Sequence, residues 1–118
     1  MINRAFNPHL SVRPGFPKTE LPALFVWFDR VRDSIADDAA PRDMFDWVEW
    51  QWDRMCAEAV FTLGIYKDGA LCGYCESVDG DDLAWIQLVL KRDLWRTAKP
   101  AVNLCLQEIG RASCRERV

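Results

Sequence analysis

This sequence lacks the features of several protein classes. No apolar run reaches the roughly 20 residues that cross a bilayer, so we expect no membrane-spanning segment and no membrane partner. The N-terminal stretch MINRAFNPHL has no apolar core of about 7–15 residues, so we expect no secretion signal there. The formal net charge is −3, which argues against a nucleic-acid partner held by net charge.

Metal-ligating and disulfide-forming residues are also few or badly spaced. The single histidine, His9, has no cysteine or carboxylate nearby at ligand spacing, and the five cysteines are scattered and odd in number. Cys72 and Cys75 have the C-x-x-C spacing of thiol-disulfide exchange enzymes. They fall in an expected strand, however, where residues three apart point to opposite faces. We therefore expect no metal site, no redox site and a reducing, cytoplasmic location.

What the sequence does have is enough apolar and aromatic material for one domain. Half of its 118 residues are hydrophobic and 12% are aromatic, with six tryptophans among them. A chain of this length and composition is expected to form one globular domain, and no repeat or linker divides it. The tryptophans must either lie in the core of that domain or contact a partner.

The middle of the chain predicts a three-stranded antiparallel meander. Three apolar or alternating runs, Val60–Tyr66, Ala70–Val78 and Leu83–Leu90, have the length and composition of strands. Asp68-Gly69 and Asp79-Gly80 separate them, and Asp-Gly between such runs is a strong hairpin signal because glycine adopts positive φ without steric cost. The third run is almost continuously apolar, which is typical of a strand covered on both faces.

A short strand at His9–Arg13 and two helices are expected before the meander. Apolar residues at spacings of three and four over 21–35 predict an amphipathic helix with Thr19 as its N-cap. The charged residues between its apolar positions are interpreted as a solvated face: Asp29, Arg30, Arg32 and Asp33.

The second helix is expected to run from Pro41 to about Ala59, with the proline in its first turn. One stripe of this helix is expected to face the core: Phe45, Val48, Trp52, Met55, Cys56 and Ala59. Trp47 and Trp50 lie off the stripe. They are interpreted either as a surface for an acceptor or partner, or as residues covered by a further part of the protein.

The last eleven residues differ in character from the apolar helical pattern before them. Over its whole length, Glu108–Val118 resembles the in-frame translation of a common short-read sequencing adapter. We therefore expect residues 1–107 to be the N-terminal part of a single domain, and residues 108–118 to be an artefact.

The order of the expected elements, and the residues after the third strand, resemble the GNAT family of N-acetyltransferases. That fold begins with a strand, two helices, a three-stranded antiparallel meander and a helix whose N-terminal loop holds the pyrophosphate of acetyl-CoA. The family loop reads Arg/Gln-x-x-Gly-x-Gly/Ala, and the corresponding stretch here is Arg96-Thr97-Ala98-Lys99-Pro100-Ala101. Arg96 and Ala101 match its first and last positions, whereas Lys99 replaces the central glycine and Pro100 follows it. The resemblance implies an α+β fold, the N-terminal part of a GNAT-like domain, cut short after its third helix begins.

This resemblance also implies a function and a set of site residues. The full-length protein would transfer the acetyl group of acetyl-CoA to an amine on a small molecule or a protein, and this fragment is expected to be inactive alone. The residues implied in binding acetyl-CoA are the end of the third strand and the start of the following helix: Leu90, Arg96, Thr97, Ala98, Lys99 and Ala101. Backbone N–H groups at a helix start bind phosphates, and the basic stretch Lys91–Lys99 fits either phosphate contact or simple solvation.

No catalytic residue is assigned from the sequence. Glu76 and Gln87 are the only polar side chains well placed along the strands, and glutamine cannot act as a base.

A second function stays open beside the enzyme. The chain is short and tryptophan-rich and has an altered loop, and in these features it resembles GNAT-like proteins encoded by tailed bacteriophages. That resemblance implies a catalytically silent module that serves assembly. Under that alternative the protein would be located in the virion rather than in the cytoplasm. It would form a homodimer or be a component of the phage particle. Lys99 and Pro100 favour this alternative, while Arg96 and the order of elements favour the enzyme.

Overall fold

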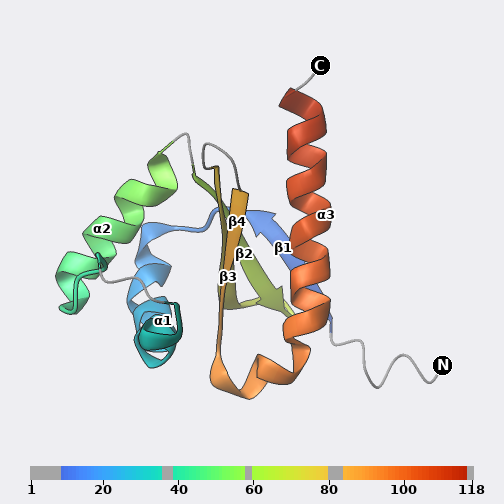
Figure 1. Cartoon of the computed structure of the whole chain (residues 1–118). Helices are drawn as coiled ribbons and strands as arrows, with labels where there is room; N and C mark the ends of the chain where they lie inside the picture. Colours follow the sequence, from blue (N-terminus) through green and yellow to red (C-terminus); the bar gives the residue numbers. More distant parts are fainter. Residues whose placement is uncertain (1–8, 36–38, 58–59, 80–83, 117–118) are drawn as a thin grey trace.

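The elements follow the order expected from the sequence (Figure 1). The structure is a computed structural model that describes residues 9–35, 39–57, 60–79 and 84–116. Its helices and strands are β1 (Leu10–Pro14), α1 (Leu21–Ile35), α2 (Met44–Cys56), β2 (Val60–Lys67), β3 (Ala70–Asp79), β4 (Ala84–Leu90) and α3 (Ala98–Glu116). Two short 3₁₀ helices, η2 (Lys18–Glu20) and η3 (Arg92–Thr97), lead directly into α1 and α3.

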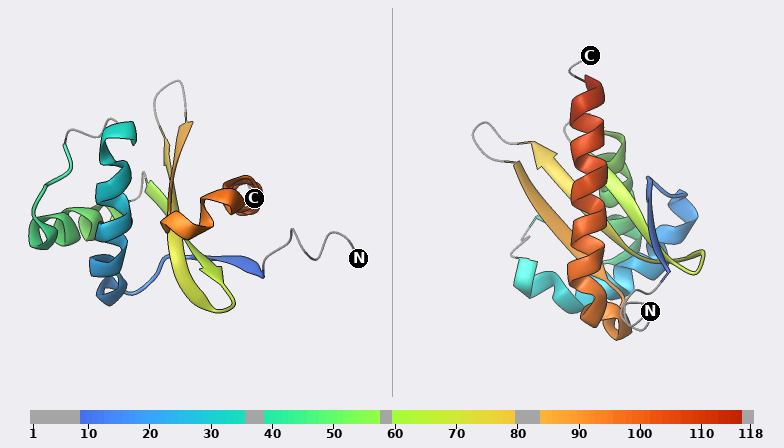
Figure 2. Two further views of the ribbon diagram at one scale, coloured as in Figure 1. Left: turned by 90° about the horizontal axis from the view of Figure 1, so that it is seen from below. Right: turned by 90° about the vertical axis from the view of Figure 1, so that its right-hand side faces the viewer.

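The four strands form one antiparallel sheet in the order β1-β2-β3-β4. Helices α1 and α2 cover one face of this sheet and α3 covers the other, which is clearest in the left view of Figure 2. Each face has its own hydrophobic cluster: Phe28, Trp47 and Tyr74 belong to the cluster on the α1/α2 side, and Leu63 and Cys105 to the cluster under α3. The expectation of an α+β fold with this order of elements is confirmed.

The β2–β3 hairpin turn is the one that Asp68-Gly69 predicts. Asp68 has φ 53° and Gly69 has φ 85°, and the flanking Lys67 and Ala70 pair across the two strands. Two consecutive positive φ angles are typical of a type I′ turn, whose twist matches that of the strands it joins. The second expected turn, Asp79-Gly80, extends into residues 80–83, which lie outside the described residues.

Strand β3 contains a bulge, and the bulge corrects one expectation. Ile65 pairs with Gly73 and Tyr66 with Leu71, so Cys72 is an extra residue with no partner in β2. This extra residue reverses the alternation of side chains along β3. Cys72 and Cys75 therefore both pack in the cluster under α3, whereas residues three apart were expected on opposite faces.

The N-cap of α1 and the start of α2 differ from the expected ones. Thr19 lies inside η2 and is not the N-cap of α1. Helix α2 begins at Met44 rather than Pro41, because the Asp43 carboxylate accepts a hydrogen bond of 3.2 Å from the backbone N–H of Asp46 and caps the helix there.

The core-facing side of α2 also differs from the expected stripe. Trp47 is fully buried and contacts Phe25 and Phe28 of α1, with ring centroids 5.5 and 5.2 Å apart. Phe45, which was expected in the core, is 75% exposed. The helix is therefore rotated so that Trp47 and Gln51 face the core. The predicted stripe is wrong at Phe45 and at Cys56, which is also exposed, and its last residue, Ala59, lies outside the described residues.

The charged face of α1 is only partly solvated. Arg32 is 5% exposed, and its guanidinium donates hydrogen bonds to the carbonyls of Ala40 and Pro41 at 2.9 and 2.8 Å. It also pairs with the Asp29 carboxylate at 3.0 Å. Arg32 thus ties the segment before α2 to α1, and its assignment to a solvated face is wrong.

Helix α3 runs through the position where residues 1–107 were expected to end. It continues to Glu116 without a change of secondary structure at residue 108, and the division into 1–107 and 108–118 stays a prediction. Within the described ranges, no helix has both the length and the apolar character needed to cross a membrane.

Candidate functional site

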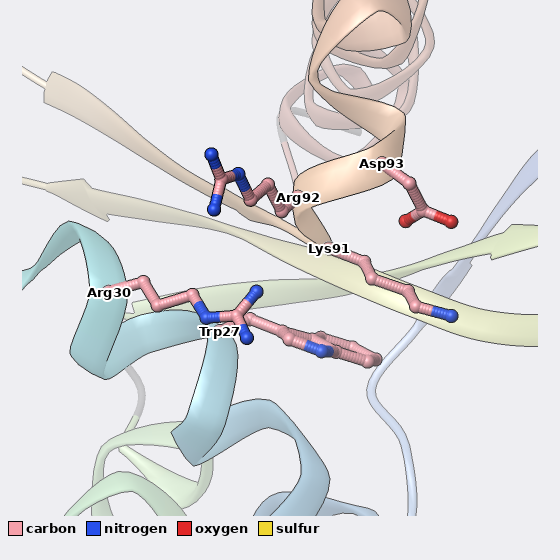
Figure 3. Close-up of a pocket in the computed structure, with 5 residues that line it drawn as sticks. All are labelled: Trp27, Arg30, Lys91, Arg92 and Asp93. Carbon is pink, nitrogen blue, oxygen red and sulfur yellow. The ribbon is translucent and has the colours of Figure 1, made fainter.

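A hollow of about 490 Å³ lies between α1 and the junction of β4 with η3. We call it the basic pocket. Figure 3 shows its five lining residues, which come from two separate parts of the chain: Trp27, Arg30, Lys91, Arg92 and Asp93. Its volume falls within the range of about 300–1,000 Å³ that is usual for small-molecule sites.

Hydrogen bonds hold the β4–η3 side of the basic pocket in place. The backbone N–H of Lys91 donates to the carbonyl of Cys72, the bulge residue of β3, at 2.9 Å. The carbonyl of Lys91 accepts from the N–H of Leu94 at 2.9 Å, which forms the first turn of η3. The indole N–H of Trp95 donates to the carbonyl of Leu90 at 3.0 Å. The turn that carries Lys91 and Arg92 is thus fixed to the sheet on both sides.

The α1 side of the pocket is formed by two residues one helical turn apart. Trp27 and Arg30 are three positions apart on α1, so their side chains lie on the same side of the helix. Trp27 is half-buried and packs partly against the α1/α2 cluster, whereas Arg30 is exposed. Sequence reasoning missed both residues. Trp27 lies off the apolar stripe of α1, which was the only signal for it, and Arg30 had none.

The basic pocket carries an excess of unpaired positive charge. Arg30, Lys91 and Arg92 are all exposed cations, and Asp93 is the single acidic residue among the lining side chains. In the described part of the chain, the ion pairs form elsewhere and none involves these four residues. Three cations without ion-pair partners around a hollow are an arrangement that suits an anion with more than one negative charge.

None of the six residues implied in acetyl-CoA binding lines the basic pocket. Leu90 is 3% exposed in the cluster under α3, and Ala101 is fully buried in the same cluster. The Thr97 hydroxyl donates to the carbonyl of Leu94 at 2.6 Å, and the N–H of Ala98 donates to the carbonyl of Trp95.

The two basic members of this set, Arg96 and Lys99, are exposed. The helical segment begins at Arg92, before the start near Arg96 that was expected, so the residues nearest its free N-terminal end are those of the basic pocket. The role of the six residues in binding acetyl-CoA stays a prediction.

A row of buried polar side chains crosses the sheet beneath α2. Thr62, Glu76 and Gln87 are cross-strand neighbours on β2, β3 and β4, and all three are buried. The Glu76 carboxylate accepts from Gln51 Nε2 at 3.2 Å and from Arg54 Nη2 at 2.9 Å. Both of its oxygens are therefore engaged by α2, which makes Glu76 part of a structural ion pair rather than an available base.

Two of the buried cysteines, Cys72 and Cys75, have thiols with raised pKa values, whereas the hydrogen bond with Cys75 lowers the pKa of Cys105. A hydrogen bond with the Cys105 thiol, together with burial, raises the pKa of Cys75. Burial raises the pKa of Cys72, whose thiol also donates to the carbonyl of Ile65 at 3.3 Å. Among the described residues, no group of three or more histidines, cysteines or carboxylates is placed to hold a metal ion.

Comparison with known proteins identifies the fold. No known family and no curated protein matches this sequence. Among solved structures, it is similar to an acetyltransferase from Trypanosoma brucei, with 15% identity, a TM-score of 0.56, and coverage of 87% of this chain and 75% of that one. The fold is GNAT-like.

A second solved structure supports the GNAT-like fold. It is a protein from Clostridium acetobutylicum described as a predicted acetyltransferase and solved with acetyl-CoA. Its identity to this chain is 11% and the TM-score is 0.56, with coverage of 91% of this chain and 75% of that one. At these identities the similarity establishes the GNAT-like fold and leaves activity to be argued from the site.

Proposed function

We propose that this protein is an acetyl-CoA-dependent N-acetyltransferase. The observation that carries the proposal is the basic pocket, where three cations without ion-pair partners among the described residues lie between α1 and the end of β4 in a GNAT-like fold. Acetyl-CoA carries negative charge in the diphosphate that joins its nucleotide to its pantetheine arm. This diphosphate would lie at the basic pocket if the arm runs along β4. Guanidinium and ammonium groups are the usual protein partners of such phosphates.

The open edge of β4 supports the same function. In the described part of the chain β4 pairs only with β3, so the backbone N–H and C=O groups on its other edge have no neighbouring strand. An extended ligand with amide groups can add to such an edge through main-chain hydrogen bonds. The pantetheine arm has two amides, and it would run along β4 from the basic pocket towards Gln87.

Arg96 and Lys99 would add positive charge beside the pocket, as the family resemblance implies. The acceptor is an amine on a small molecule or a protein, and the reaction would take place in the cytoplasm. We assign no catalytic residue, because both carboxylate oxygens of Glu76 are already hydrogen-bonded.

Isothermal titration calorimetry with acetyl-CoA tests this function. Binding is expected to weaken about tenfold or more in each of Lys91→Gln and Arg92→Gln, the usual effect of losing one charge-assisted hydrogen bond. It is also expected to weaken as salt is raised. Arg42→Gln is the matched control, because Arg42 is an exposed arginine that does not line the pocket. No binding at millimolar acetyl-CoA would end the enzyme proposal.

The alternative is a catalytically silent GNAT-like module, for example one that assembles in a bacteriophage particle. The substitutions Lys99 and Pro100 in the expected pyrophosphate loop favour it. An acetyl-transfer assay with a panel of amines separates the two functions, since the silent module would release no free coenzyme A above background while folding normally.

A further inference from the structure

We infer that the basic pocket recognises the nucleotide end of the donor, with Trp27 as the surface on which the adenine ring stacks and Arg30 as a phosphate contact. This inference rests on the proposed function and deepens it. It makes α1 part of the donor site, and it names the donor class as a thioester of coenzyme A rather than one carried on a protein.

The first observation is the position of the Trp27 indole. Part of this side chain packs against the α1/α2 cluster, and part of it lines the basic pocket. In Figure 3 the ring lies beside the Lys91 side chain and next to Arg30. A ring held by packing from one side offers a rigid π surface on the other, and stacking of a base on such a ring depends little on base identity.

The second observation is the amount of charge. Coenzyme A carries a diphosphate and a further phosphate on its ribose, all at the nucleotide end. A donor carried on a protein has the same pantetheine arm but only one phosphodiester. Three unpaired cations from two elements exceed what one phosphodiester needs, and they suit the several phosphates of the nucleotide.

The third observation is the separation between the charges and the sheet centre. Lys91 and Arg92 follow the last residue of β4, and Gln87 lies four residues before Lys91. At a rise of about 3.3 Å per residue, that separation is about 13 Å along the strand. The pantetheine arm would bridge this distance, so the thioester would lie far from Trp27 and the nucleotide next to it.

Adenosine 3′,5′-bisphosphate is the probe that tests the inference, because it has the nucleotide end and no pantetheine. We expect it to bind the intact protein and to compete with acetyl-CoA. Trp27→Ala should weaken its binding about tenfold or more, and Trp27→Phe should keep most of the affinity because an aromatic ring remains. Arg30→Gln should weaken binding by a similar factor.

Three controls accompany these variants. Phe45→Ala removes an exposed aromatic residue on α2 and should leave binding unchanged. Thermal unfolding of Trp27→Ala shows whether the fold survives, and Trp27→Phe gives the answer if it does not. Inorganic pyrophosphate measures the contribution of charge alone and should bind more weakly than the bisphosphate.

The outcomes separate the inference from the proposed function. If acetyl-CoA binds but the bisphosphate does not, or if Trp27→Phe and Trp27→Ala bind the bisphosphate equally, the inference is overturned and the proposed function stands. If the bisphosphate binds as expected but acetyl-CoA supports no transfer to any amine, the inference stands and the enzyme is excluded. If neither ligand binds, both are overturned.

Discussion

The buried ion pair beneath α2 gives the sharpest prediction about stability. Glu76 is 1% exposed, and its carboxylate is held by Arg54 at 2.9 Å and by Gln51 at 3.2 Å. The Arg54 side chain is 26% exposed, and its guanidinium lies over the Trp50 ring at 4.8 Å from the centroid. The two charged groups therefore differ in solvation, because the Arg54 guanidinium can reach water and the Glu76 carboxylate cannot.

Arg54→Met should therefore lower the free energy of unfolding more than Glu76→Gln does. Removing one partner of a fully buried pair costs about 3–5 kcal/mol, and the partial exposure of Arg54 lowers this to about 2–4 kcal/mol. For a domain of this size, that loss lowers the melting temperature by about 8–16 °C. Glu76→Gln leaves a cation that water can solvate and keeps an acceptor for Gln51, so its cost should be about 1–2 kcal/mol.

The assay is urea unfolding of the two single variants and the double variant. The double variant should be more stable than the sum of the single losses predicts, because it leaves no buried carboxylate without a partner. Arg111→Met is the matched control: Arg111 pairs with Glu108 on the surface of α3, at 62% and 23% exposure, and should change stability by less than about 1 kcal/mol. Equal losses for Arg54→Met and Glu76→Gln, or strict additivity, would refute the reasoning.

Three further predictions concern packing and thiols. Trp47→Ala should lower the free energy of unfolding by about 3–5 kcal/mol and Phe45→Ala by about 0.5 kcal/mol or less, as measured by urea unfolding. A larger loss for Phe45→Ala than for Trp47→Ala would support the core stripe expected from the sequence instead. Gly73→Ala should cost about 1–3 kcal/mol, because a Cβ there would lie 2.4 Å from a carbonyl oxygen of β4, and an unchanged melting temperature would contradict this close approach. Iodoacetamide at pH 8 should label the exposed Cys56 much faster than the buried Cys75 in the folded protein, as read by mass spectrometry.

The thiols also give stability a dependence on pH. Burial raises the pKa of Cys72 above the unfolded value of about 8.5, whereas the hydrogen bond between Cys75 and Cys105 raises one pKa and lowers the other, so the prediction rests on Cys72. As pH rises past that value the unfolded chain releases the Cys72 proton first. The contribution of Cys72 to the free energy of unfolding should therefore fall between pH 8 and pH 10, and Cys72→Ala should reduce the slope. A slope that is flat or rising over this range would contradict the assignment.

The order of elements was predictable because local signals decide it. Asp68-Gly69 fixes the hairpin by its own backbone preference, and apolar spacing over 21–35 fixes the first helix. These signals depend on residues close in sequence, and distant packing does not override them here.

The face of α2 was not predictable from its pattern. Apolar residues occur on nearly every side of this helix, so the spacing of Phe45, Val48 and Trp52 fits one stripe as well as Trp47 fits another. The choice is made by tertiary contact with Phe25 and Phe28 of α1. Hydrophobic periodicity identifies the core-facing side of a helix only when another side of that helix is clearly polar.

The basic pocket was only half predictable. Lys91 and Arg92 belong to a basic stretch that already suggested phosphate contact, because they follow a strand and open a helical segment. Trp27 and Arg30 are about 60 residues away in the chain, and only the packing of α1 against the sheet places them opposite. No signal within α1 separates Arg30 from an ordinary solvated arginine.

The single extra residue in β3 brings one more side chain to the cluster under α3 without moving its neighbours. Leu71 lies opposite Tyr66 and Gly73 opposite Ile65, so a chain without Cys72 would pair regularly and keep both residues on the faces they have now. The carbonyl beside Gly73, which accepts the Lys91 N–H, would then come from Leu71. Relatives should therefore differ in whether they have a residue at position 72 and still hold the turn that carries Lys91 and Arg92.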